Sequence, residues 1–539
     1  MKEQSTTKGF AVLSIAGILV KILSLLYVPL LLQIIGDEGY GIYTASYDIF
    51  SLIYVMTTAG MQVAVAKQVS ELIALNNYKD AVKTFKIARA LLLLVGTLAS
   101  LLLMIFAQPI ANATKSSKSF YAIIALSPTV LVTSVLSAYR GYFQGRSIMT
   151  PTAISQIIEQ IANIVLSLFF AYILIGKNIE LGAAGGTIGT TVGALIAVIY
   201  LMMLYKKHRA IKVTKSEINS PEVKRLSNKQ LLKRLIKYGM PLTLSSGMQY
   251  LGAVIDMALV KIRLEVAGFG ELDRNIKYAL LGKYKTLIYV PLAIIAALSA
   301  AVLPAISRSV VLNDKKAVKE KINFALRVSY LISIPSAVGL AVLSKPLYTL
   351  LFSERFSGGA QLMQYGSIVV VLMAVVQIQT TILQSMNRLY IVLVSLGVGI
   401  LAKLISNYIF IAMPEINING AIIGSILCFL IPMIINNIAL RKTLKIRISL
   451  LKHAFKPLVA SAFMGLIVYI TYFNVETLLI NHIHSRIISS IPTLVSIAVG
   501  MVVYGYGLIL TGGITKKDLA IMPARLLKLI PSFVIKRIR

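Results

Sequence analysis

Residues 86–107 read KIARALLLLVGTLASLLLMIFA, and no charged side chain occurs in residues 90–107. A helix needs about 20 mostly apolar residues to cross the hydrocarbon core of a membrane. Together with this run, fourteen runs of the same kind lie between residues 9 and 511. The sequence therefore predicts an all-α, polytopic membrane protein with 14 transmembrane helices.

The composition of the 539-residue chain agrees with this prediction. It is 57% hydrophobic and 14% charged, whereas soluble proteins are on average about 45–50% apolar and about 25% charged. A net charge of +34 would suit a nucleic-acid-binding protein if the chain were soluble. Because the basic residues lie between the apolar runs, they are typical of cytoplasmic loops. We therefore expect no nucleic acid as a partner.

The basic residues also predict the orientation, because loops rich in Lys and Arg stay in the cytoplasm. With the N-terminus inside, 40 of the 54 Lys and Arg residues fall on the inner side and 12 on the outer side. We expect a plasma-membrane protein with both termini in the cytoplasm. The stretch 261–285 is the exception, since it is basic and yet external in this arrangement.

Short sequences recur at an offset of about 235–238 residues, which indicates an internal duplication. LIYV occurs at 52–55 and 287–290, KDAVK and KKAVK at 79–83 and 315–319, and GAAGGT and GAIIGS at 182–187 and 420–425. Each copy contains six spans, so the two copies enter the membrane from the same side. We predict two six-helix bundles that form a parallel pseudo-twofold repeat. This arrangement is typical of transporters in which the two bundles move against each other around a binding site near the membrane midplane.

The duplication divides the chain into five parts. We predict an N-terminal six-helix bundle at 1–205, a cytoplasmic basic linker at 206–235, a C-terminal six-helix bundle at 236–440, two extra helices at 441–511 and a cytoplasmic basic tail at 512–539. The second part of the linker and the tail have the composition of basic amphipathic helices that lie on anionic membrane lipids. The alternative for the linker is an ordinary connection between the bundles.

Charged residues within the predicted spans are candidates for the substrate cavity, because a charge at that depth is costly and usually faces a cavity. Lys21 lies 12 residues into the first span, or about 18 Å, near the midplane, where it would bind an anionic substrate. Asp48 and Asp256 lie toward the outer ends of their spans. Four basic residues flank the predicted outer connection of spans seven and eight and are expected to line a vestibule for a diphosphate: Lys261, Arg263, Lys283 and Lys285. The alternative is that these residues pair with one another or extend to the membrane surface.

Two polar pairs occupy equivalent places in the duplication and are candidates for gating or coupling. Glu159 precedes Asn163 by four residues, and Lys403 precedes Asn407 by four. Because similar depth would let the two charges meet, we expect Glu159 and Lys403 to form a gate between the bundles. The glycines at 182, 185, 186, 189 and 193 have the spacing that permits close helix packing.

Enzyme chemistry finds little support. The lone cysteine, Cys428, excludes an intrachain disulfide. His482 and His484 form the best candidate for a metal site, but with only Glu476 nearby they are more typical of a solvated loop. The sequence contains no Walker A motif, so we expect neither a metal nor ATP hydrolysis.

A motif that begins directly after the fourth predicted span and continues into the fifth carries a family resemblance. Arg140-Gly141-Tyr142-Phe143-Gln144-Gly145 is followed by PTAISQIIEQ at 151–160. With fourteen spans and the parallel duplication, it resembles the polysaccharide-transport branch of the MOP exporter superfamily. Within this branch the chain is similar to the stage V sporulation protein B-like and lipid II flippase-type membrane proteins of Gram-positive bacteria. The resemblance covers essentially the whole chain.

The resemblance implies a transporter or flippase that moves an undecaprenyl-diphosphate-linked saccharide, lipid II or a related polysaccharide unit, from the inner to the outer leaflet by alternating access. It implies a central cationic cavity, in which Lys21 is the basic residue of the first span, and a groove for the polyprenyl tail at the two extra helices. Tyr27 and residues 52–54 stand where Gram-negative lipid II flippases have further arginines. We expect no cofactor beyond a coupling ion, Na⁺ or H⁺, or the membrane potential. Expected partners are the lipid-linked oligosaccharide, anionic membrane lipids and cell-wall synthesis proteins.

Two alternatives stay open. A cation-coupled drug or metabolite antiporter of the same superfamily would favour acidic cavity residues, against which Lys21 counts. A membrane glycosyltransferase or polymerase would need a large extracytoplasmic domain or a cluster of catalytic carboxylates, and the sequence has neither feature. We therefore expect that the protein is not an enzyme.

Overall fold

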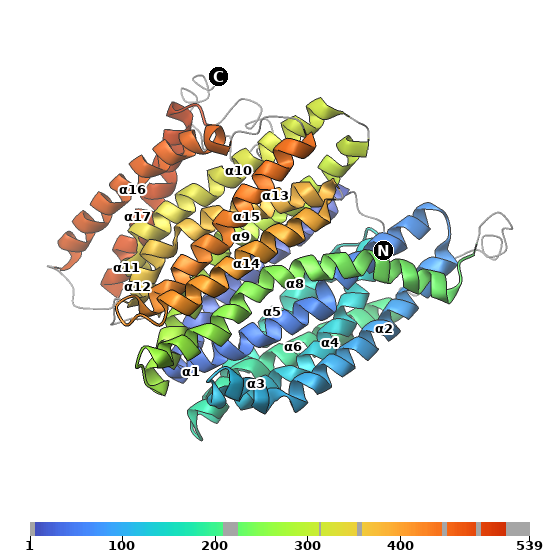
Figure 1. The fold of residues 1–539 in the computed structure, drawn as a ribbon, viewed down its shortest axis with the longest axis horizontal. Helices are drawn as coiled ribbons and strands as arrows, with labels where there is room; N and C mark the ends of the chain where they lie inside the picture. The colour runs from blue at the N-terminus through green and yellow to red at the C-terminus, as the bar shows by residue number, and fades with distance from the viewer. Residues whose placement is uncertain are drawn as a thin grey trace. The chain divides into compact units, whose positions relative to one another are not determined.

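The computed structural model describes residues 6–207, 225–311, 314–352, 358–386, 388–444, 450–480 and 487–513. Every regular element in these ranges is a helix (Figure 1), which confirms the all-α class. The long helices are α1 (Thr6–Ala74), α2 (Tyr78–Ile105), α4 (Phe120–Gly145), α5 (Thr150–Ile175), α6 (Ile179–Lys207), α8 (Asn228–Val266), α9 (Glu271–Val311), α10 (Lys315–Val342), α13 (Ile368–Ser385), α14 (Leu389–Phe410), α15 (Gly420–Leu444), α16 (Leu450–Ile480) and α17 (Ile487–Leu510). Short elements connect them: α3 (Ala107–Ala113), η1 (Ser117–Ser119), α11 (Ser344–Phe352), α12 (Gly358–Gly366) and η2 (Asn417–Asn419).

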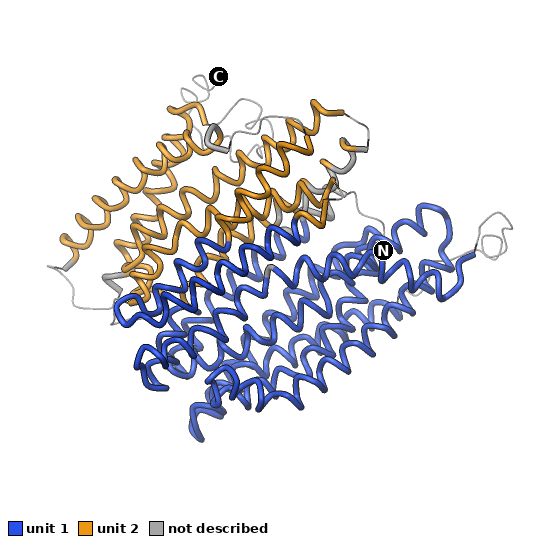
Figure 2. The backbone as a smooth tube through the Cα atoms, viewed as in Figure 1, with its two compact units in different colours: residues 1–282, 392–428 blue, residues 283–391, 429–539 orange. Residues whose placement is uncertain are grey.

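The chain forms two compact units (Figure 2). The first unit contains residues 1–282 and 392–428, and the second contains residues 283–391 and 429–539. Helices α9, α14 and α15 therefore each contribute to both units. Most of the predicted linker, the C-terminal tail and the His482–His484 pair lie outside the described residues.

Helix α1 is long enough for two membrane crossings. Its 69 residues would extend about 100 Å as one straight helix, against about 30 Å of hydrocarbon. Gly36 breaks it with φ 68° and ψ −178°, a backbone conformation that glycine adopts without strain. The two predicted spans at 9–34 and 40–66 thus lie on the two sides of this break.

Twelve helices among the described residues are long and apolar enough to cross a membrane. One of them is the part of α1 at Ile15–Ala74, whereas α8 is not among the twelve. The protein is therefore a multi-pass membrane protein by length and composition. The number of 14 crossings and the two six-helix repeats stay predictions.

In the first unit, glycines let helices approach backbone to backbone. A Cβ atom at Gly185, Gly189 or Gly193 of α6 would overlap the backbone of α5, and α5 and α6 pack against each other extensively. The close packing predicted from the glycine spacing is confirmed. Aromatic side chains of α2 and α4 build the adjoining core, with Phe85 between Tyr139 and Tyr142.

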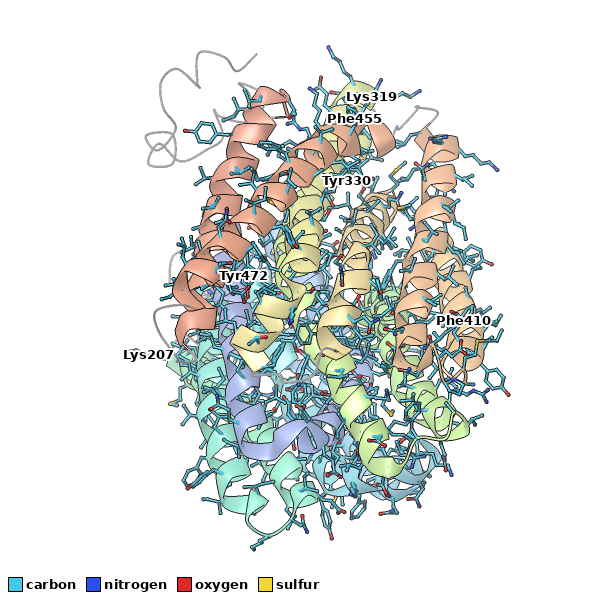
Figure 3. The ribbon with its side chains drawn as sticks, turned by 90° about the vertical axis from the view of Figure 1, so that its left-hand side faces the viewer. Lys207, Lys319, Tyr330, Phe410, Phe455 and Tyr472 are labelled. Atoms are coloured by element: carbon cyan, nitrogen blue, oxygen red, sulfur yellow. The ribbon has the colours of Figure 1, made fainter. Side chains whose placement is uncertain are left out.

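In the second unit, α16 and α17 pack against each other, and α10 lies against α16. The outward surface of α16 is apolar, with Phe455 67% and Phe463 55% exposed. Figure 3 shows Phe455 and Tyr472 far apart along α16, with side chains projecting from the helix between them. Such a surface suits contact with lipid.

Candidate functional site

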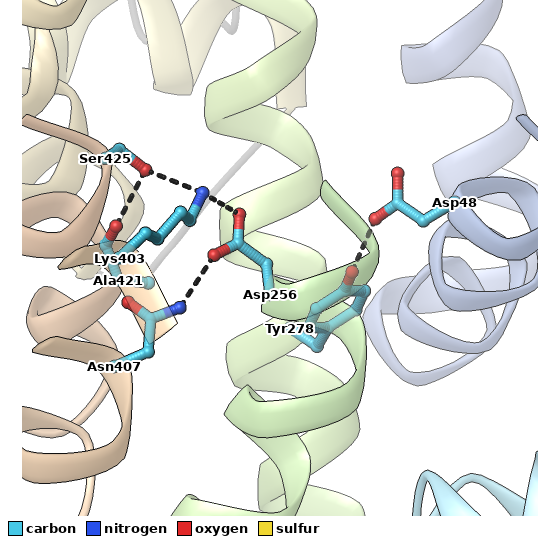
Figure 4. Close-up of polar contacts among 7 residues, drawn as sticks. All are labelled: Asp48, Asp256, Tyr278, Lys403, Asn407, Ala421 and Ser425. Carbon is cyan, nitrogen blue, oxygen red and sulfur yellow. Dashed lines mark hydrogen bonds and ion pairs between the residues drawn. The ribbon is translucent and has the colours of Figure 1, made fainter. Parts of the chain in front are cut away.

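Four polar side chains from α8, α14 and α15 meet inside the first unit; we call Asp256, Lys403, Asn407 and Ser425 the Asp256 cluster (Figure 4). Lys403 Nζ lies 2.8 Å from Asp256 Oδ2 and 3.2 Å from Ser425 Oγ. Asn407 Nδ2 donates to Asp256 Oδ1 over 2.9 Å. Asp256 is 2% and Lys403 4% exposed, so the carboxylate and the ammonium neutralise each other in a buried place.

Helix periodicity explains how the cluster assembles. Lys403 and Asn407 are one turn apart on α14 and present both side chains to α8, where Asp256 accepts from each. Gly424 of α15 packs directly against Asn407 Oδ1, which a side chain at position 424 would displace. Removing one partner of a buried ion pair costs about 3–5 kcal/mol, because the other charge stays behind unpaired.

Asp48 of α1 takes part in a separate contact beside this cluster. Tyr278 of α9 donates its hydroxyl hydrogen to Asp48 Oδ2 over 2.5 Å (Figure 4). Tyr278 is completely buried, whereas Asp48 is half-buried. Asp48 and Asp256, both predicted in the substrate cavity, are therefore bound to other side chains in this structure.

The family motif forms a second ion pair in the first unit. Arg140 Nη2 of α4 lies 2.6 Å from Glu159 Oε2 of α5, and Arg140 Nε donates to Ser155 Oγ over 3.0 Å. The two parts of the motif, one on each helix, thus hold α4 and α5 together. Arg140 is buried and Glu159 partly exposed.

The remaining motif residues make packing contacts. A Cβ atom at Gly141 would lie 2.7 Å from the Gln62 carbonyl oxygen, and one at Gly145 2.7 Å from that of Ala66. Gln62 Nε2 donates to Gln144 Oε1 over 3.2 Å. Phe143 is buried in the core. These contacts bring α4 close to α1.

The expected gate between Glu159 and Lys403 is not the pairing found in this structure. Glu159 pairs with Arg140, and Lys403 pairs with Asp256. The reason is that equivalent positions in a repeat share a depth, while the neighbouring helices decide the partner. Asn163 also differs from Asn407, since its Oδ1 accepts from Ser167 Oγ over 3.0 Å and from Thr190 Oγ1 over 3.2 Å.

The connection predicted between spans seven and eight is shorter in the structure, residues 267–270 between α8 and α9. Helix α9 begins at Glu271, and its acidic first turn favours a helix start there. Lys283 and Lys285 therefore lie about three turns inside α9 rather than beside the connection. Lys283 is completely buried, with Nζ 5.7 Å from the centre of the Phe352 ring, and Lys285 is half-buried.

Lys261 and Arg263, near the end of α8, are likewise engaged. Lys261 is completely buried, and Nζ donates to Ser116 Oγ over 2.7 Å and to Asn275 Oδ1 over 2.8 Å. The Arg263 guanidinium carbon lies 3.9 Å from the centre of the Tyr408 ring. In this structure Lys261 ties α8 to neighbouring segments and does not line an open vestibule.

Lys21 differs from these charges. Its side chain on α1 is exposed in the isolated chain, and it has neither a hydrogen bond nor an ion pair within the described ranges. An unpaired ammonium at this depth is unfavourable in hydrocarbon, so it is expected to face water or an anion.

Sequence reasoning missed Ser425, Tyr278 and Ser155 as partners of the buried charges. Ser425 closes the repeated segment GAIIGS, which was the available signal. Ser155 lies within the motif stretch 151–160, and no comparable pattern marks Tyr278. Among the described residues, no group of three or more His, Cys, Asp or Glu side chains could hold a metal ion.

Comparison with known proteins adds three findings. Residues 6–310 match the model of a family described as polysaccharide biosynthesis protein. Over 517 residues, 93% of this chain and 94% of the other, the chain is 26% identical to a Bacillus subtilis (strain 168) protein named lipid II flippase MurJ. It is 27% identical over 459 residues, 84% of this chain and 87% of the other, to the stage V sporulation protein B of the same strain.

Solved structures share the fold. A structure of the lipid II flippase MurJ in an inward closed conformation matches with a TM-score of 0.67 at 17% identity, covering 94% of this chain and 99% of the other. A multidrug resistance MATE family transporter of the MOP superfamily in an inward-facing conformation matches with a TM-score of 0.66 at 15% identity, covering 80% and 98%. At these identities the likeness is one of fold.

Proposed function

Because the chain belongs to the polysaccharide biosynthesis protein family, we propose that it is a flippase that carries an undecaprenyl-diphosphate-linked saccharide from the inner to the outer leaflet. The substrate class is lipid II or a related polysaccharide unit, in line with the names of its relatives. Two six-helix bundles, residues 1–205 and 236–440 among 14 membrane crossings, alternate access to a central site. Neither ATP hydrolysis nor another enzymatic step is part of the proposal.

The chemistry of such a substrate fits this architecture. Its charged head must cross about 30 Å of hydrocarbon while its tail stays in lipid, which calls for a wet path that opens sideways. The apolar outer surface of α16, with Leu466 57% and Phe473 60% exposed, supports a tail groove at α16 and α17.

Lys21 carries the proposal. It is the exposed ammonium of α1 that lacks a partner within the described ranges, and a diphosphate would supply the missing anion. Charged hydrogen bonds to phosphate are among the strongest that a side chain makes.

We expect Lys21→Ala to abolish flipping without loss of folded protein, because the diphosphate loses its cation. Lys21→Arg should retain activity, since charge matters more here than shape. The measurement is the transfer of fluorescent lipid II across liposomes that contain the purified full-length protein. Lys79→Ala, which removes an exposed lysine at the start of α2, is the matched control. Unchanged transfer by Lys21→Ala would contradict a role of this residue in substrate binding.

The antiporter alternative finds less support. A cationic substrate would need unpaired carboxylates at depth, whereas Asp256 and Glu159 are both ion-paired within the chain. We propose that an ion gradient or the membrane potential drives the cycle. Anionic lipids at the basic inner surface and cell-wall synthesis proteins are the proposed partners.

The proposed orientation places both termini in the cytoplasm of a plasma-membrane protein. In a Cys428→Ser background, we expect an impermeant thiol reagent to label Ser117→Cys but not Leu75→Cys in intact cells. Both side chains are exposed: Leu75 lies in the turn before α2, and Ser117 begins η1, which follows α2 and α3. The Leu75 side is followed by more basic residues. Labelling at position 75 in intact cells would contradict the orientation.

A further inference from the structure

The Asp256 cluster gathers oxygen atoms as a cation site does. Asp256 contributes its carboxylate from α8, Ser425 its hydroxyl from α15, and Asn407 its side-chain amide from α14 (Figure 4). Asn407 Oδ1 is buried and has no hydrogen-bond partner in the described part of the chain. The Ala421 carbonyl, one turn before Ser425 on α15, accepts from Ser425 Oγ over 2.8 Å. Oxygen donors of this kind suit hard cations.

The Lys403 ammonium contacts two of these oxygens, whereas Asn407 turns its Nδ2 toward Asp256 and its Oδ1 toward Gly424. Lys403 Nζ lies at hydrogen-bond distance from both Asp256 and Ser425. With one carboxylate and one ammonium, the cluster is neutral, so an additional free cation would leave an uncompensated buried charge. Gly252 of α8 lies beside the ammonium, since a Cβ atom there would be 3.9 Å from Nζ, an ordinary van der Waals contact.

We infer that Lys403 is a tethered cation in a monovalent-cation site, so that the wild-type protein binds neither Na⁺ nor K⁺ between α8, α14 and α15. Shortening Lys403 exposes the site, because the space of its side chain opens toward Asp256, Ser425 and Asn407. One consequence for transport is that this cluster does not couple the cycle to a free cation, and this consequence rests on the proposed function. The claim that Lys403 occupies the cation site does not rest on the proposed function.

The test is the thermal midpoint of the purified full-length protein in about 100 mM Na⁺, K⁺ or choline, the last being too large to enter the site; binding to the native state alone raises the midpoint in step with ion concentration. The wild-type midpoint should be the same in all three. The Lys403→Ser midpoint should fall in choline and rise by several degrees, in a saturable way, with Na⁺ or K⁺. Adding Asp256→Asn to Lys403→Ser should abolish the response.

Lys118→Ser is the matched control, because it breaks a partly exposed ion pair with Glu38 and should show no ion response. Lys403→Asn, whose amide can still donate to Asp256, is measured as well and serves if Lys403→Ser does not fold. Lack of a response in the Lys403 variant that folds would make the pair purely structural and overturn the inference. A wild-type response that Asp256→Asn removes would overturn it too.

Transport is measured separately in Na⁺ and in choline. Equal flipping of lipid II by the wild type in both solutions agrees with the tethered cation. Absence of flipping, together with the expected midpoints, would refute the proposed function and leave the cation site standing. The two claims therefore fail independently.

Discussion

We expect Asp256→Ala to lose most of its folded protein, with a loss of stability of about 3–5 kcal/mol. The substitution leaves the Lys403 ammonium, 4% exposed, without its carboxylate. It also removes the acceptor of the Asn407 amide. The measurement is the fraction of monodisperse protein after extraction, together with its thermal midpoint.

A double variant separates charge from packing. Asp256→Asn with Lys403→Met removes both charges and keeps an acceptor for Asn407, so it should recover most of the folded protein. Glu320→Ala removes an exposed carboxylate of α10 and should change stability by less than about 0.5 kcal/mol. If Asp256→Ala proves as stable as the wild type, the folded protein tolerates the buried Lys403 ammonium without the Asp256 carboxylate, which would contradict this prediction.

Gly189→Leu should give no folded protein, and Gly189→Ala should cost about 1–3 kcal/mol. A Cβ atom at this position would overlap the Asn163 carbonyl oxygen and the Ser167 backbone nitrogen of α5. Backbone atoms cannot turn aside as a flexible side chain does, so α5 and α6 would have to separate. Thermal midpoints and extraction yields measure the loss.

Gly339→Ala in α10 is the matched control. A Cβ atom there meets no atom within 4 Å, and alanine favours a helix by about 1 kcal/mol over glycine. This variant should be at least as stable as the wild type. Equal stability of Gly189→Ala and Gly339→Ala would show that the approach of α6 to α5 tolerates a methyl group.

Much of the fold could be predicted, because the positions of the helices and of their close contacts depend on the local sequence. The apolar runs predicted helices at the observed places, and the spacing of Gly185, Gly189 and Gly193 predicted the tight face of α6. The start of α9 was misplaced because the polar turn at Glu271 begins a helix that continues into the next apolar run.

The site was predicted only in part. The sequence identified Glu159, Asp256 and Lys403, since few charges occur within apolar runs, and Arg140 only as part of the family motif. It predicted that Glu159 pairs with Lys403, whereas in the structure Glu159 pairs with Arg140 and Lys403 with Asp256. Ser425 lies in the repeated segment and Ser155 in the family motif, but neither pattern says which charge they contact, and nothing in the local pattern distinguishes Tyr278.

By itself, the sequence determined that this is a helical membrane protein with buried charges at certain depths, because hydrophobicity and helix rise act along the chain. Only the tertiary structure decided that Lys403 meets Asp256 and Arg140 meets Glu159. The physical reason is that depth follows from counting residues, whereas the partner of a buried charge depends on which helices pack beside it and on how each is rotated about its axis.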